Sequence, residues 1–163
     1  MKKLLLLLLP ILLAGCSNQA DFETMSDMYL EPQPARADTV TFSVPNDAAV
    51  TVMENEALGS IYLCDGYTIT VQTVPAGNLD ATLRDITGYS KENIRLMQRD
   101  FEGKTRYSCV WTAAGEGGDQ VGRAEILDDG DYHYILSVMG DAASAGDLAE
   151  AWQEIFATFN IVP

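Results

Sequence analysis

The chain has 163 residues, a length typical of one domain with a sizeable core. Its 24 acidic and 10 basic residues give a formal charge of −14 at pH 7. This charge argues against nucleic acid as a partner and against direct contact with anionic lipid headgroups, because both require a basic surface. The single histidine, His133, excludes metal sites built from two or three histidines, and we predict no metal and no cofactor.

Residues 1–15 have the features of a secretory signal peptide. Lys2 and Lys3 precede an apolar run over residues 4–13. The run is too short to cross a bilayer, which takes about 20 apolar residues, and it fits the apolar part of an export signal. It ends in Leu13-Ala14-Gly15-Cys16, which resembles the lipobox of bacterial lipoproteins.

The lipobox resemblance implies that Cys16 carries a lipid. In these lipoproteins the cysteine thiol receives diacylglycerol and the signal is cut before it, so that acyl chains hold the protein on a bilayer. Removal of residues 1–15 takes away two lysines and no acid, so the formal charge changes from −14 to −16. We predict a lipid-anchored protein on the extracytoplasmic face of the cell membrane. The alternative is a secreted protein with an incidental cysteine.

Residues 16–38 are predicted to form a lipidated, flexible tether. The stretch is polar and acidic, contains Pro32 and Pro34, and has neither a helical nor a strand period. In the alternative interpretation its apolar side chains dock on the domain or on a partner, namely Met25, Met28, Tyr29 and Leu30.

Residues 39–163 are predicted to form a single α+β domain that opens with strands. Residues 39–44 alternate as a strand does, and residues 50–53 fit a second short strand. Asp65-Gly66 then favours a two-residue hairpin turn between residues 60–64 and 67–74, because both turn positions require positive φ. This turn predicts one shared core face, made of Tyr62, Cys64, Tyr67, Ile69 and Val71.

A helix over residues 78–87 and a second hairpin are predicted next. Asn78 fits the N-cap of the helix, and Gly88 fits its end. The hairpin joins residues 94–101 to 104–112 through Glu102-Gly103. Its apolar face holds Ile94, Leu96, Tyr107, Cys109 and Trp111, and its polar face, expected to point outward, holds Arg95, Arg99, Lys104 and Arg106.

The third hairpin, residues 121–127 and 132–139 around Asp129-Gly130, is apolar on both faces. This pattern predicts the centre of a sheet covered on both sides, and a two-residue turn would place His133 opposite Ile126. A helix then begins near Ser144 and presents an apolar stripe to the sheet, made of Leu148, Trp152, Ile155, Phe156 and Phe159. The predicted fold class is α+β, an antiparallel sheet with helices packed on it.

The order of these elements resembles the PsbP-like fold. The similar features are the strand 40–44 ending at Pro45, the mid-chain helix, the strand 132–138 and the closing helix over residues 152–159. The resemblance implies an α/β/α sandwich and favours a binding role, because the members of that family mostly bind other proteins. It carries over no functional residue.

Three further features are candidates for chemistry. Cys64 and Cys109 both fall on apolar faces, so they either form a disulfide or remain buried free thiols. His133 is interpreted as a strand histidine with a satisfied hydrogen bond, because no nucleophile or acid accompanies it at a suitable spacing. Residues 128–131 lack the ligand spacing of a calcium loop and are predicted to be a turn with solvated carboxylates.

We expect a non-enzymatic binding or accessory protein that engages a protein partner at the cell envelope. The lipid anchor, the tether and the missing catalytic set favour this hypothesis, and no catalytic residue is predicted. The alternative is a small-ligand or cation-binding protein with a pocket between sheet and helix, lined by Tyr67, Trp111, Tyr134 and Trp152. A hydrolase is the least favoured hypothesis.

Overall fold

The computed structural model describes residues 37–52, 58–115 and 117–162. The predictions for the signal peptide, for Cys16 and for the tether up to residue 36 lie outside these residues. In chain order the elements are β1 (Thr39–Thr41), β2 (Ala49–Val52), β3 (Leu58–Cys64), β4 (Tyr67–Pro75), α2 (Leu79–Thr87), η1 (Lys91–Asn93), β5 (Leu96–Phe101), β6 (Lys104–Gly115), β7 (Gly118–Asp128), β8 (Tyr132–Asp141), α3 (Ala145–Ala157) and β9 (Asn160–Val162).

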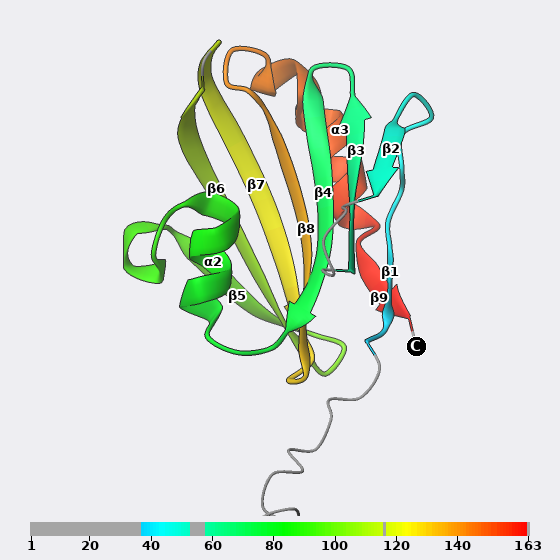
Figure 1. Cartoon of the computed structure of the whole chain (residues 1–163), viewed down its shortest axis with the longest axis vertical. Helices are drawn as coiled ribbons and strands as arrows, with labels where there is room; N and C mark the ends of the chain where they lie inside the picture. The colour runs from blue at the N-terminus through cyan, green and yellow to red at the C-terminus, as the bar shows by residue number, and fades with distance from the viewer. Residues whose placement is uncertain (1–36, 53–57, 116, 163) are drawn as a thin grey trace, which may run out of the picture. The chain divides into compact units, whose positions relative to one another are not determined.

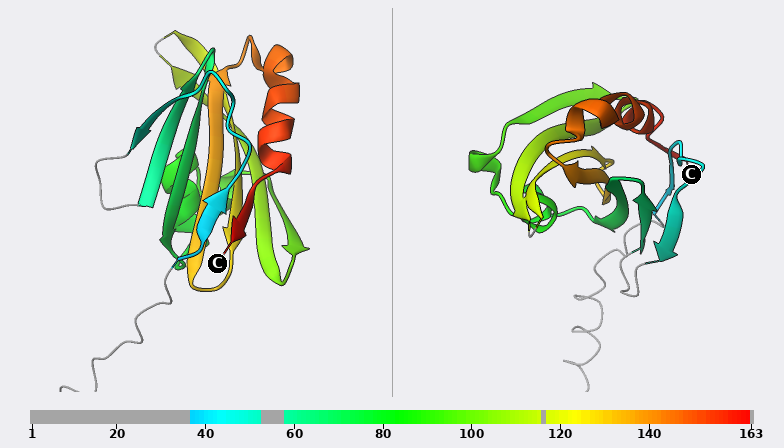
Figure 2. Two further views of the ribbon diagram at one scale, coloured as in Figure 1. Left: turned by 90° about the vertical axis from the view of Figure 1, so that its right-hand side faces the viewer. Right: turned by 90° about the horizontal axis from the view of Figure 1, so that it is seen from above.

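The main sheet has seven antiparallel strands in the order β2-β3-β4-β8-β7-β6-β5 (Figure 1). Strand β8 takes the middle position with β7 beside it, which confirms that the third hairpin forms the centre of the sheet. The opening strand is shorter than predicted, and β1 pairs with β9 instead of joining the main sheet (Figure 2). Strand β1 is therefore paired with a strand from the other end of the domain, β9.

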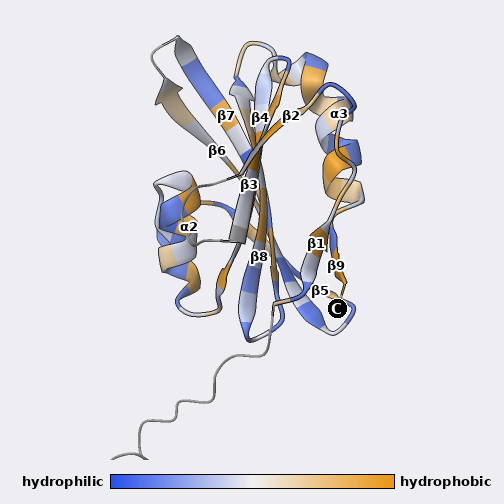
Figure 3. Cartoon of the chain, turned by 45° about the vertical axis from the view of Figure 1, so that its right-hand side comes forward, coloured by the Kyte–Doolittle hydropathy of each residue, from blue (hydrophilic) through white to orange (hydrophobic). Residues whose placement is uncertain are grey.

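Helices α2 and α3 lie on opposite sides of the sheet (Figure 3). Helix α2 begins as predicted, because the Asn78 side chain accepts a hydrogen bond from Asp80 N at 3.0 Å, and it ends at Gly88 with φ 77°. Helix α3 begins after Ser144, whose side chain makes no capping hydrogen bond. No helix in the described part of the chain is long and apolar enough to span a bilayer.

Each helix covers its own apolar cluster, so the sheet is buried from both sides. The cluster under α3 includes Ile69, Leu127, Tyr134, Leu136, Val138, Trp152, Ile155, Phe156 and Phe159. The cluster under α2 includes Leu83, Cys109, Trp111, Ala124, Ile126 and Ile135. Alternate residues of β7 and β8 enter the two clusters, as the apolar pattern on both faces predicts.

The register of the third hairpin differs from the prediction. Asp128 pairs with His133, and Ile126 pairs with Ile135, so the loop is longer than a two-residue turn. The Asp129 side chain accepts hydrogen bonds from the N–H groups of Asp131 and Tyr132 at 2.9 and 2.7 Å, which stabilises the wider loop. The shift is by two residues, so every side chain keeps its predicted face.

Candidate functional site

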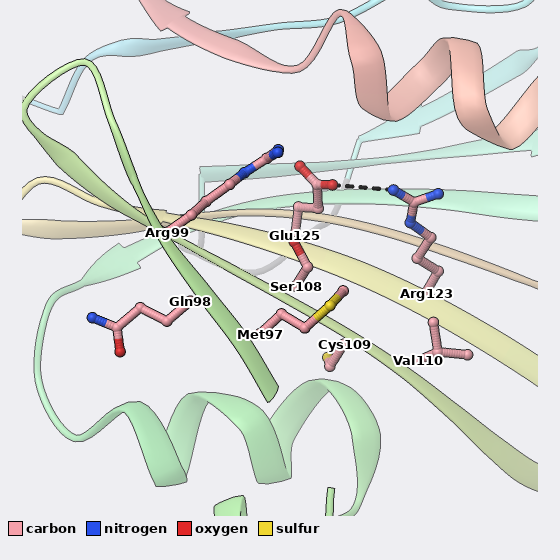
Figure 4. A pocket seen from close by; sticks show the side chains of 8 residues that line it. All are labelled: Met97, Gln98, Arg99, Ser108, Cys109, Val110, Arg123 and Glu125. Atoms are coloured by element: carbon pink, nitrogen blue, oxygen red, sulfur yellow. Dashed lines mark hydrogen bonds and ion pairs between the residues drawn. The ribbon is translucent and has the colours of Figure 1, made fainter. Parts of the chain in front are cut away.

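A groove lies on the α3 side of the sheet, over β5, β6 and the neighbouring part of β7, beside helix α3. Helix α3 places Trp152, Ile155 and Phe156 in the cluster of the middle strands. Met97 on β5 is 61% exposed and Val110 on β6 is 56% exposed. A cavity of about 600 Å³ opens here, lined by Met97, Gln98, Arg99, Ser108, Cys109, Val110, Arg123 and Glu125 (Figure 4).

A second hollow of about 380 Å³ continues this cavity towards α3. It shares Arg99, Arg123 and Glu125 with the first, and Gln153 and Phe156 of α3 form its other wall. Figure 4 shows Arg99, Glu125 and Arg123 reaching to the side on which α3 lies. We call the two hollows together the α3 groove, defined by Met97, Arg99, Ser108, Val110, Arg123 and Glu125.

Beneath the groove lies a buried ion-pair network centred on Glu125. One carboxylate oxygen is 3.1 Å from Nη1 of Arg106, and the other is 3.2 Å from Nη2 of Arg123. Arg106 also donates a hydrogen bond to the backbone oxygen of Phe159 at 2.8 Å, and its guanidinium lies 3.7 Å from the centre of the Phe101 ring. The network joins β6 and β7 to Phe159, the second residue after α3.

The network corrects the prediction that the polar face of the second hairpin points outward. Arg106 is 3% exposed and Glu125 is also 3% exposed. The reason is that the segment after α3 covers this part of the sheet: Phe159 supplies its backbone oxygen and its ring to Arg106, and Phe101 of β5 supplies a second ring. The available signal was Glu125 itself, a lone acid among the apolar residues of the most hydrophobic hairpin.

Arg99 lies directly opposite Arg106 in the β5–β6 pair, so two like charges face each other. Burial lowers the pKa of Arg106, Glu125 raises it, and the charge of Arg99 lowers it again, with a net lowering. In the residues that the structure describes, Arg99 makes no ion pair of its own. The groove is therefore locally cationic, although the chain carries a formal charge of −14.

The four residues predicted to line one pocket do not meet. Tyr67 and Trp152 pack together with ring centres 6.2 Å apart, and Tyr134 belongs to the same cluster. Trp111 lies on the opposite face, in the cluster under α2. A pocket with these four residues requires Trp111 and Trp152 on one face of the sheet, whereas the sheet separates their two clusters.

The sequence leaves open whether Cys64 and Cys109 form a disulfide, and in the structure both are free thiols. Cys64 packs against the cluster under α3, whereas Cys109 belongs to the cluster under α2. The sheet stands between the two sulfur atoms. Burial raises the pKa of Cys109 to about 11 and also raises the pKa of Cys64, which leaves both thiols protonated at neutral pH.

His133 is a buried strand histidine, as interpreted from the sequence. Its Nδ1 lies 2.9 Å from the hydroxyl of Thr82 on α2, and its Nε2 lies 3.7 Å from a carboxylate oxygen of Asp128. It is 1% exposed. Within the described ranges no group of histidine, cysteine and acidic side chains is arranged to hold a metal ion.

No family model and no curated protein matches the sequence. Solved structures do match the fold. Cyanobacterial PsbP from Synechocystis is 9% identical with a TM-score of 0.57 over 79% of this chain and 90% of its own. LpqN of Mycobacterium tuberculosis, described as involved in cell envelope biogenesis, is 14% identical with a TM-score of 0.51 over 78% of this chain and 85% of its own. These matches confirm the α+β class and the likeness to PsbP-like proteins.

Proposed function

We propose that this chain is a non-enzymatic accessory lipoprotein that binds a protein partner at the cell envelope through the α3 groove. The observation that carries the proposal is the pair of exposed apolar side chains, Met97 and Val110, beside the arginines of the groove. Exposed apolar surface next to charge is typical of protein-binding sites. A fold shared with an envelope-biogenesis protein supports the envelope as the location.

Site-specific photo-crosslinking in the native cell tests the groove. A photoreactive amino acid replaces Val110, which lies in the groove, or Leu63, which is 52% exposed on β3 at the other half of the sheet. We expect one envelope protein to be crosslinked in stoichiometric amounts from position 110 and not from position 63. A folded, abundant protein that yields no specific adduct from position 110 would contradict the proposal.

Membrane attachment through Cys16 is tested separately. Cells are fed a clickable fatty acid, and the intact chain is compared with Cys16→Ala. We expect label and membrane fractionation for the intact chain, and loss of both for the variant, because the acyl chains supply the attachment. Membrane fractionation of Cys16→Ala at the level of the intact chain would contradict lipid anchoring at this residue.

A further inference from the structure

Strand β5 leaves one edge of the main sheet open. It is the last strand in the order, and in the described residues it pairs only with β6. Residues 97–100 are exposed on both faces of the strand. An open edge offers a row of unpaired N–H and C=O groups to any extended segment that approaches it.

On the face of β5 that carries Arg99 the positive charge is not balanced, because Asp100, the neighbouring acid, projects from the opposite face. Arg99 faces Arg106 across the β5–β6 pair, and Glu125 is already bound to Arg106 and Arg123. In the part of the chain that is described, no carboxylate lies within ion-pair distance of Arg99. Like charges placed opposite each other destabilise a strand pair, so a carboxylate arriving from outside would relieve this repulsion.

The apolar side chain at this edge is Met97, which lies two residues before Arg99 in β5. Met97 and Arg99 project from the same face of β5, because alternate residues of a strand share a face. Met97 lies opposite Ser108, and Val110 lies next along that face of β6. An incoming strand would therefore meet a positive charge and an exposed apolar surface at a spacing of two residues.

We propose that an extended acidic segment of the partner protein adds to β5 as a further strand, with a carboxylate beside Arg99 and an apolar side chain beside Met97. Main-chain hydrogen bonds to the open edge would supply affinity, and the acid–x–apolar spacing would supply specificity. The inference rests on the proposed function and adds the chemistry of the partner. A second copy of this chain fits less well, because pairing β5 with β5 brings two arginine-bearing strands together.

Peptide binding to the full-length lipoprotein in neutral lipid nanodiscs tests the chemistry. The probe is a capped ten-residue peptide that repeats the pattern Glu-Thr-Val-Thr, so that glutamate and valine lie two residues apart on one face of the strand, and its binding is measured by fluorescence anisotropy. Its controls carry lysine in place of glutamate, or N-methyl groups on alternate amides. We expect binding by the glutamate peptide alone, with slower hydrogen exchange in residues 96–101. Equal binding of the lysine peptide would overturn the acidic specificity, and equal binding of the N-methylated peptide would overturn strand addition.

Charge reversal links the probe to the partner in the cell. We expect Arg99→Glu to weaken binding of the glutamate peptide by about tenfold or more and to remove the crosslink from position 110. Lys91→Glu is the matched control, because it makes the same charge change on the exposed η1 segment outside the groove, and it should change neither result. An unchanged crosslink in folded Arg99→Glu would overturn this inference and leave the proposed function standing. Absence of a crosslink from position 110 in the chain that retains Arg99 would overturn both this inference and the proposed function.

Discussion

The two faces of the main sheet are built from the same strands but differ in chemistry. On the α2 face, β6 and β7 bring Trp111 against Gly122, where an added Cβ would lie 2.3 Å from the indole ring. On the α3 face, the neighbouring residues of the same strands form the network of Arg106, Glu125 and Arg123. One face is closed by packing, whereas the other holds charge beside an open groove.

Under the proposed function, this difference separates stability from binding within one sheet. The α2 face is filled by apolar contacts, and its buried polar side chains are paired, as His133 is with Thr82. The α3 face is filled only over its middle strands, and its outer strands expose Met97 and Val110. A partner can therefore approach the α3 face without displacing any core residue.

The largest effect is expected at the buried acid. Glu125→Gln leaves the guanidinium of Arg106, whose side chain is 4% exposed, without a counter-charge, and should cost about 3–5 kcal/mol of unfolding free energy. Urea denaturation measures the loss. The matched control is the double variant Arg106→Met/Glu125→Leu, which removes the buried pair together and should recover most of the stability, because Arg123 remains partly exposed. A double variant as unstable as Glu125→Gln would contradict this account.

The next largest loss of stability is expected on the α2 face. Gly122→Ala places a methyl group against the Trp111 ring, which is itself 5% exposed and cannot move away. We expect a loss of about 1–3 kcal/mol from overpacking, measured by the same denaturation. Gly77→Ala is the control, because nothing lies within 4 Å of the added carbon, and its stability should stay close to that of the unsubstituted chain. Peptide binding to Gly122→Ala should be unchanged if the α2 face serves packing alone.

The sequence predicts the features that depend on neighbouring residues and misses those that depend on contacts between distant parts of the chain. The hairpins, the cap at Asn78 and the central place of β8 follow from local patterns, because turn chemistry and alternation act over a few residues. The pairing of β1 with β9 joins the two ends of the domain, and no local signal reports it. Likewise, burial of Arg106 depends on where the segment after α3 crosses the sheet, since the backbone oxygen of Phe159 accepts a hydrogen bond from its Nη2.

A smaller loss of stability is expected at the loop between β7 and β8, which contains Asp129. Burial opposes ionisation of Asp129, but hydrogen bonds from Tyr132 N, the Tyr134 hydroxyl and Asp131 N outweigh it and hold the pKa of Asp129 below its ordinary value. Its contribution to stability is therefore present above the unfolded pKa of about 3.9 and is lost as the pH falls through the folded pKa. Tyr134→Phe removes the 2.8 Å bond to Asp129 and should cost about 1 kcal/mol at pH 7.

The pH series provides the check on that assignment. Unfolding of the unsubstituted chain and of Tyr134→Phe is measured from pH 7 down to pH 2. The difference between the two should shrink as the pH falls, because protonation of Asp129 weakens the bond that the variant lacks. A difference that stays constant across the series would assign the effect instead to the 3.0 Å hydrogen bond that the same hydroxyl accepts from Asp38 N.

The smallest effect expected is a difference in reactivity between the two thiols, which involves no change of stability. Cys64 is half-buried on the α3 side and Cys109 is 3% exposed on the α2 side. In the folded protein at pH 8, iodoacetamide should modify Cys64 before Cys109, because burial keeps Cys109 protonated and out of reach. Without reductant, both should be modified once the protein is unfolded, as read by mass spectrometry of tryptic peptides. A peptide pair joined through these two cysteines in protein from its native source would contradict the separation of the two faces, because the sheet lies between the sulfur atoms.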